Sequence, residues 1–132
     1  MLNLVTLVQI AAISLPPQPC LVLEPTVSEL VGVVEERTFP GPPTYGESPT
    51  DSQETQLILV LEAQICVRPA EGEPPDASWG RITEITLVPI HTASRSIPRK
   101  KRIKVVGTLF EAHTAHHHTP VLMSVQSVTE VV

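Results

Sequence analysis

The chain has 132 residues, of which 42% are apolar, 17% charged and only 3% aromatic, and its formal net charge at pH 7 is −5. This length suits one domain with a single apolar core, and the negative charge argues against a general polyanion-binding protein. The fourteen prolines gather between apolar runs, where they indicate loops rather than a disordered tract.

Residues 1–19 are predicted to be a signal-like or flexible N-terminal segment. The run LVTLVQIAAISL resembles the apolar core of a secretory signal, and Ala12 and Ser14 provide small residues for a cleavage site. No Lys or Arg precedes the run, Gln9 interrupts it, and it is too short to span a bilayer. We expect a periplasmic or secreted protein with one folded domain at 20–132, and an ordinary N-terminal strand is the alternative for the first segment.

Five segments with the periodicity of strands follow, and none shows a sustained helical period. The strongest is 57–67, where apolar side chains recur at every second residue. These side chains are Leu57, Leu59, Leu61, Ala63, Ile65 and Val67. The other segments are 26–39, 81–89, 101–112 and 120–131.

Gly32 and Gly107 interrupt two of these segments. Glycine inside a strand often marks a bend or bulge at a barrel corner. Five strands without a long helix predict an all-β domain, a small five-stranded barrel similar to the OB-fold. A five- or six-stranded sandwich is the alternative.

Three stretches of the chain carry a resemblance to a known family. They are TFPGPPTYGES at 38–48, ETQLILVLEAQICV at 54–67 and KVVGTLFEAHTAHHHTPVLMSV at 104–125. Together they resemble the domain of unknown function 4431 family of small bacterial domains, over about residues 20–128. The chain departs from the family pattern at Ala115, where the family has glycine, and at Gly46, which is an additional or shifted residue. The resemblance implies a fold region and an exported context, with one cysteine before the first strand and another closing the second, but no activity.

Cys20 and Cys66 match those two family positions. The residues favour the same pairing independently, because a hairpin of the first two strands around the 40–54 loop brings the start of one strand to the end of the other. We therefore predict a disulfide, which the chain-entropy model values at roughly 4 kcal/mol for a loop of about 46 residues. Two reduced thiols in a cytosolic protein are the alternative.

Four of the five histidines lie within six residues, and they are His113, His116, His117 and His118. If 116–118 continue a strand, His116 and His118 point to one side and His117 to the other. The first two could then supply imidazole ligands to zinc, copper or nickel. The alternative is a hairpin tip whose imidazoles bond to backbone groups and to each other.

The predicted fold brings two loops together. In an OB-fold the loop between the first two strands and the loop between the last two flank one binding face. Here these are 39–48 and 113–119, and we predict one ligand site in which Tyr45 and Glu47 lie beside the histidines. A carboxylate or phenol beside an imidazole can fix its tautomer or complete a metal shell. The alternative is that the loops only pack together to close the end of the barrel.

The remaining motifs favour a binding or structural module. The run RKKR at 99–102, followed by Lys104, invites the alternative of a single-stranded nucleic-acid-binding OB domain. Few aromatic residues are available for stacking, however, so a solvated turn that protects an edge strand is expected instead of a nucleic-acid site. Apart from the two-loop site, the acidic positions Glu47, Asp51 and Glu54 are expected only to solvate a loop.

Enzyme signatures are missing from the sequence. It has no His-Glu-x-x-His, no Gly-x-Ser-x-Gly and no glycine-rich phosphate loop, so no enzyme is predicted. No cofactor is predicted beyond the zinc or copper that His116 and His118 could hold. The expected partner is an unidentified protein or small ligand.

Overall fold

The computed structural model describes residues 4–6, 20–74, 76–90 and 94–132. The predicted N-terminal segment at 1–19 lies outside the described residues except for 4–6. Within the described ranges, no helix is long and apolar enough to cross a membrane.

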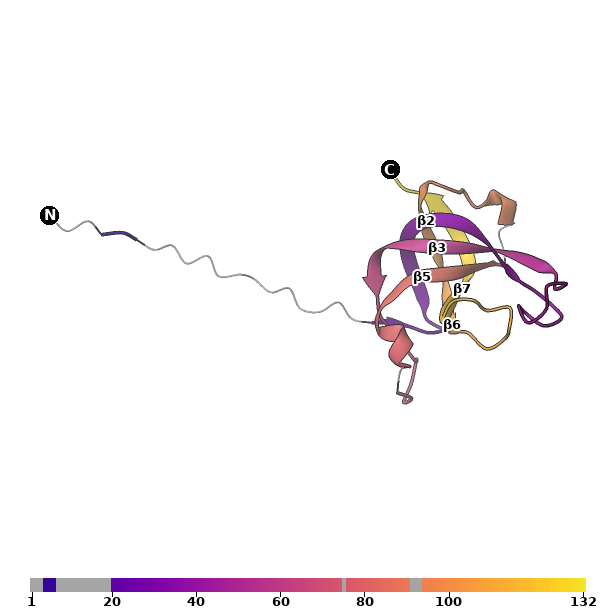
Figure 1. The fold of residues 1–132 in the computed structure, drawn as a ribbon. Helices are drawn as coiled ribbons and strands as arrows, with labels where there is room; N and C mark the ends of the chain where they lie inside the picture. Colours follow the sequence, from indigo (N-terminus) through magenta and orange to yellow (C-terminus); the bar gives the residue numbers. More distant parts are fainter. Residues whose placement is uncertain (1–3, 7–19, 75, 91–93) are drawn as a thin grey trace.

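Five long strands form one sheet that closes into a ring (Figure 1). They are β2 (Val27–Pro40), β3 (Gln53–Ile65), β5 (Ile82–Pro89), β6 (Arg102–Glu111) and β7 (Val121–Glu130). Their order around the ring is β2-β3-β5-β7-β6, and all neighbours are antiparallel except β5 and β7. This is the strand order of an OB-fold, so the predicted all-β, barrel-like class is confirmed. Each of the five predicted strands is present.

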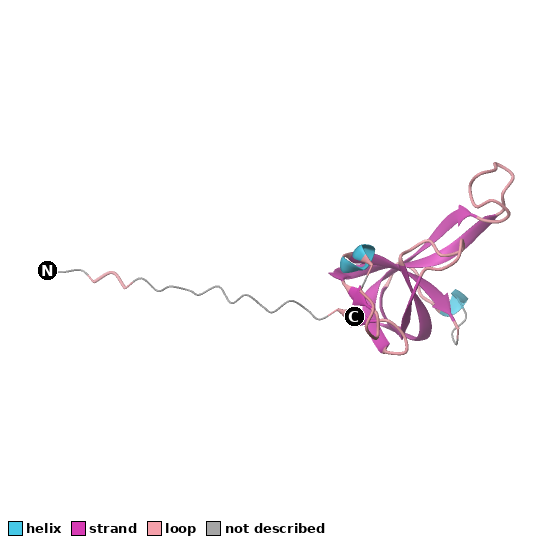
Figure 2. Ribbon diagram, turned by 90° about the horizontal axis from the view of Figure 1, so that it is seen from below, coloured by secondary structure: helices cyan, strands magenta, loops and turns pink. Residues whose placement is uncertain are grey.

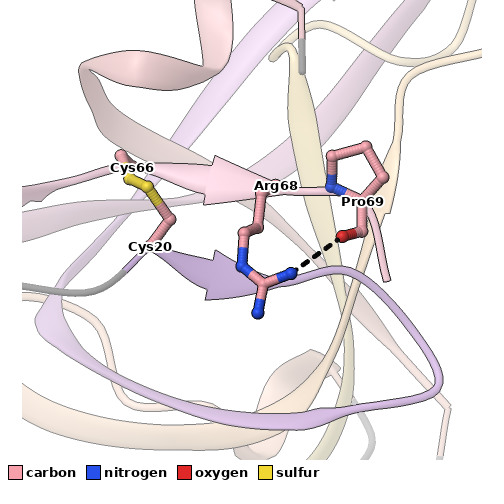
Figure 3. Close-up of a disulfide and its surroundings, with 4 residues drawn as sticks. All are labelled: Cys20, Cys66, Arg68 and Pro69. Atoms are coloured by element: carbon pink, nitrogen blue, oxygen red, sulfur yellow. Dashed lines mark hydrogen bonds between the residues drawn. A yellow bond between two sulfur atoms is a disulfide. The ribbon is translucent and has the colours of Figure 1, made fainter. Parts of the chain in front are cut away.

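Two short strands lie at the end of the barrel at which β3 finishes. β1 (Leu21–Val22) and β4 (Val67–Arg68) form a parallel pair. Cys20 precedes β1 and Cys66 precedes β4, and the predicted disulfide joins them with their Cα atoms 4.7 Å apart (Figure 3). Two short 3₁₀ helices, η1 (Ala77–Gly80) and η2 (Ser94–Ser96), flank β5 in the sequence.

The predicted regular strand at 57–67 is wrong at its second half. β3 ends at Ile65, and its register against β5 shifts between Val60 and Ile65. Three extra residues in β3 oppose β5 there, and as a result Ala63 is exposed rather than part of an apolar face. The first half follows the prediction, because Leu57 and Leu59 are buried inside the ring.

Both interrupting glycines lie where the ring needs close backbone approach. Gly32 pairs with β3 and with β6, at the point where β2 passes from one partner to the other. Gly107 follows the register shift between β6 and β7, and a Cβ atom there would overlap the carbonyl oxygen of Ser124. The predicted corners are therefore real, and side chains larger than hydrogen do not fit in them.

Three residues are buried although they lie outside the ring. Ile58 of β3 pairs with Thr86 of β5, which pairs with Leu122 of β7, and all three are no more than 2% exposed. Ile58 and Leu122 do not belong to the central core cluster. The outer face of β3, β5 and β7 therefore has a cover of its own, and the loop that follows β6 runs there.

Candidate functional site

The hairpin of β2 and β3 ends in residues 41–52, which we call the proline loop. This hairpin projects beyond the ring (Figure 2). Asp51 organises the loop, since its carboxylate accepts hydrogen bonds from the Thr44 amide and hydroxyl, the Gly46 amide and the Ser48 amide. Burial alone would raise the pKa of Asp51, but the hydrogen bonds from Gly46 and Thr44 together hold it below its ordinary value.

Tyr45 sits at the centre of this clamp in an uncommon backbone conformation. Its φ is 51°, in the left-handed region that non-glycine residues seldom adopt. Its amide donates to the Gly41 carbonyl at 3.0 Å, and the neighbouring Gly46 has a φ of 110°. The phenol of Tyr45 thus leaves the proline loop in a defined direction.

Residues 112–120 connect β6 to β7, and we call them the histidine loop. They form a loop rather than a continued strand, which corrects the geometry assumed for 116–118. In Figure 1 this loop, drawn in orange, extends to the same side as the proline loop. The phenol oxygen of Tyr45 lies 3.0 Å from Nε2 of His116, so the two predicted halves of the site meet.

Glu54 joins two of the histidines. Its two carboxylate oxygens lie 2.7 Å from Nδ1 of His116 and 2.8 Å from Nε2 of His118. The His118 and Glu54 side chains are only 16% and 19% exposed, whereas the His116 side chain is 54% exposed. The hydrogen bond from His118 is the main influence that lowers the pKa of Glu54; the hydrogen bond from His116 adds to it, and burial opposes both.

The carboxylate also fixes the His116 tautomer. An ionised carboxylate can only accept hydrogen bonds, so Nδ1 of His116 must carry a proton. In the neutral ring, Nε2 is then an acceptor and takes the hydrogen bond donated by the Tyr45 hydroxyl. Tyr45, His116 and Glu54 therefore form a directed chain of hydrogen bonds.

Further contacts hold the histidine loop against the sheet. The His118 ring stacks on Phe39, with centroids 3.9 Å apart and planes within 3°. The side-chain amide nitrogen of Gln56 donates a hydrogen bond to the His116 carbonyl oxygen at 2.6 Å. The buried Thr119 hydroxyl lies 2.8 Å from the Thr86 hydroxyl and accepts from the Thr86 amide at 3.1 Å. The last contact places the histidine loop over Thr86, one of the buried residues of the outer face.

His113 and His117 form a separate group on Phe110. Nδ1 of His117 accepts from the His113 amide at 3.0 Å, and the two rings meet edge to face with centroids 4.6 Å apart. The His117 ring also lies edge-on to Phe110 at 5.6 Å. Burial lowers the pKa of His117, and repulsion from a protonated neighbouring histidine would lower it further. A neutral ring keeps Nδ1 free to accept the amide hydrogen bond.

The carboxylate beside the histidines is Glu54 and not Glu47, the residue predicted from the sequence. Glu47 is exposed, and among the described residues the carboxylate that hydrogen-bonds to His116 and His118 is Glu54, so the predicted position of Glu47 beside these imidazoles is not found. Glu54, expected only to solvate a loop, contacts His116 and His118 instead. The missed signal is the hairpin register, which pairs Glu54 with Phe39 at the base of the loop.

The described residues show no metal centre. Among them, no group of three or more His, Cys, Asp or Glu side chains has an arrangement that could hold a metal ion. Both ring nitrogens of His116 take part in hydrogen bonds, and Nε2 of His118 bonds to Glu54. The predicted zinc or copper ligation by this pair therefore gains no support.

The basic run lies away from the histidine loop, at the other end of β6. Arg99 pairs with Glu36 at 3.0 Å, Lys101 with Glu130 at 3.3 Å, and Arg102 with Glu62. Three of the four cations of the run are thus neutralised locally by carboxylates. This arrangement fits a structural role in fastening β6 better than contact with nucleic-acid phosphates.

Two hollows flank the long strands. One, of about 340 Å³, runs beside the histidine loop, and six of its lining residues are Thr55, Gln56, Thr86, Val88, His116 and His117. A larger one, of about 540 Å³, lies at the far end of β3 near Cys66, between β2 and the exposed bulge. The larger hollow has no imidazole or aromatic ring in its lining, so chemistry favours the smaller one as a binding site.

The closed five-stranded ring, its OB-fold order and its disulfide define a small, disulfide-bonded all-β domain. The sequence profile of the domain of unknown function family DUF4431 matches residues 94–129, which span η2, β6, the histidine loop and nearly all of β7. The match supports the predicted resemblance over the segment that carries the histidine motif. No curated protein and no solved structure matches the chain significantly.

Proposed function

We propose that the chain is an exported binding module whose site is shared between the proline loop and the histidine loop. The observation that carries this proposal is the hydrogen-bonded chain from Tyr45 through His116 to Glu54 and on to His118. It joins residues more than sixty positions apart and fixes the direction of each polar group. Such preorganisation of polar groups is what a binding site requires.

The hollow beside the histidine loop is the proposed place of the ligand. Its volume of about 340 Å³ lies within the range of small-molecule sites, roughly 300–1,000 Å³. The side-chain oxygen of Gln56 has no hydrogen-bond partner among the described residues, and the His117 ring, whose Nδ1 is engaged, has its Nε2 left for a ligand. These two groups suit a small polar ligand, or a polar side chain of a partner protein, that donates a hydrogen bond to Gln56 and bonds to the His117 ring.

Export is proposed for two reasons. The signal-like composition of 1–19 is one, and the bond between Cys20 and Cys66 is the other, since structural disulfides persist in oxidising compartments. On this proposal residues 20–132 are the mature domain in the periplasm or outside the cell.

A fragment screen read by ¹H–¹⁵N shift changes tests the binding role. We expect polar fragments to shift the amides of Gln56 and Thr86, and His117→Gln to weaken their binding at least tenfold. Glu29→Gln, a matched removal of one ionisable group in the larger hollow, should leave their affinity unchanged. Fragments that gather near Cys66 instead, or that bind equally well to the His117 variant, would refute the proposed site.

A further inference from the structure

The chain of hydrogen bonds at Tyr45 has a chemical consequence that is independent of ligand binding. We propose that Tyr45 is a nucleophilic phenol, assisted by His116 as general base, and that it takes up acyl groups from activated esters. The inference does not rest on the binding role above, because it concerns the reactivity of a half-exposed hydroxyl toward any small acyl donor.

The geometry has the parts that an activated nucleophile needs. The phenol oxygen lies 3.0 Å from Nε2 of His116, and Nδ1 of the same ring lies 2.7 Å from Glu54. A hydroxyl within hydrogen-bond reach of a base, with the base oriented by a third group, is the arrangement that activates serine in unrelated hydrolases. Here the carboxylate keeps the unprotonated nitrogen directed at the phenol, and it would stabilise the imidazolium formed when the proton moves.

The surroundings hold these groups in place. Tyr45 keeps its left-handed φ of 51° because Asp51 binds the turn on both sides of it. On the other loop, Gln56 fixes the His116 carbonyl, and the stack on Phe39 fixes the neighbouring ring of His118. Backbone strain in a bulky residue persists only where the surrounding structure over-determines it, and it gathers at functional sites.

An aryl acetate is a suitable acyl donor for this reaction. The phenol oxygen of Tyr45 attacks the ester carbonyl carbon while its proton passes to Nε2 of His116. The bond between the carbonyl carbon and the aryl oxygen breaks, and the aryloxide leaves. The products are O-acetyl-Tyr45 and the phenol or its anion, and the imidazolium returns its proton to solvent. No oxidant, reductant or metal is needed.

The sequence makes the test clean, because Tyr45 is the only tyrosine in the chain. The disulfide-bonded protein is treated with p-nitrophenyl acetate at neutral pH, and acetylation of Tyr45 is followed by peptide mass spectrometry. Acetylated lysines are distinguished by their position, and an acetyl-tyrosine by its removal with hydroxylamine. We expect Tyr45 to react about 100-fold faster than N-acetyltyrosinamide, the usual lower range for general-base assistance.

The variants separate chemistry from structure. His116→Gln should bring the rate down to that of N-acetyltyrosinamide and abolish the solvent deuterium isotope effect that proton transfer gives the wild type. His113→Gln, the same change in the same loop without contact to Tyr45, should keep the wild-type rate and isotope effect. If His116→Gln does not fold, the comparison of wild type with N-acetyltyrosinamide decides alone. A Tyr45 that reacts no faster than N-acetyltyrosinamide, or as fast in the His116 variant as in the wild type, would overturn the proposal.

Discussion

Replacing Gly107 by alanine should destabilise the domain through one methyl group. The Cβ would overlap the backbone carbonyl oxygen of Ser124 and lie 3.0 Å from Cγ of Met123. Since a backbone atom of the neighbouring strand cannot rotate away, β6 and β7 must separate locally. Overpacking of this kind costs up to about 3 kcal/mol, and the reduced freedom of the unfolded chain returns roughly 0.7 kcal/mol, so we expect a net loss of about 2 kcal/mol.

Urea unfolding with the disulfide intact measures this loss. Gly80→Ala is the matched control, because a Cβ at that position has open space within 4 Å and Gly80 does not have a positive φ. The control should unfold at or slightly above the wild-type urea concentration. If Gly107→Ala unfolds together with this control, the close approach of β6 and β7 is not the reason for glycine at this corner.

Three further outcomes follow from the contacts described above. Leu59→Ala should lower the free energy of unfolding by about 2–5 kcal/mol, since Leu59 is fully buried, and a loss below 1 kcal/mol in a urea titration would show that it is not a core residue. Alkylation without reductant should leave Cys20 and Cys66 unmodified, and replacing both by serine should cost roughly 4 kcal/mol; two labelled thiols would contradict the bridge. Hydrogen bonds from Arg37 lower the pKa of Glu84, so near the ordinary glutamate pKa the unfolded chain binds more protons than the folded one, and the free energy of unfolding falls as the pH is lowered through this range. Glu84→Gln should make the free energy of unfolding less dependent on pH there. An unchanged pH dependence would contradict a contribution from this pair.

Alternation along the strands predicted the inner face of the barrel well. Leu57 and Leu59 recur at period two because one side of β3 faces the core, and that is a local property of the sequence. Ile58 is equally buried on the opposite side, where the period predicts exposure. Its neighbour Thr86 on β5 contacts Thr119 of the histidine loop, so burial of this outer face involves a distant part of the chain, and no local pattern contains that information.

The sequence predicted which two loops form the candidate site, but it did not predict which carboxylate contacts the histidines. The OB-fold order alone suggested that Tyr45 and the histidines could meet, because topology places both loops on one face. The contacts of Glu54 depend on its pairing with Phe39 of β2. This register is set by the geometry of the hairpin loop, so the sequence pattern of the strand alone does not predict it. Glu47 is also a glutamate of this hairpin, but it lies six residues before Gln53 at the base of the loop, near the loop's tip, and it is exposed.

Because the Thr86 amide donates to Thr119, hydrogen exchange at this one backbone amide reports the opening of the histidine loop. The Thr86 amide is protected by a side chain of the loop and not by a neighbouring strand, so it can exchange its proton with solvent only when the loop lifts. Its exchange rate therefore counts loop openings directly. The amides of β3 and β6 exchange through opening of the barrel itself, so the ratio of the two rates separates motion of the site from unfolding of the scaffold.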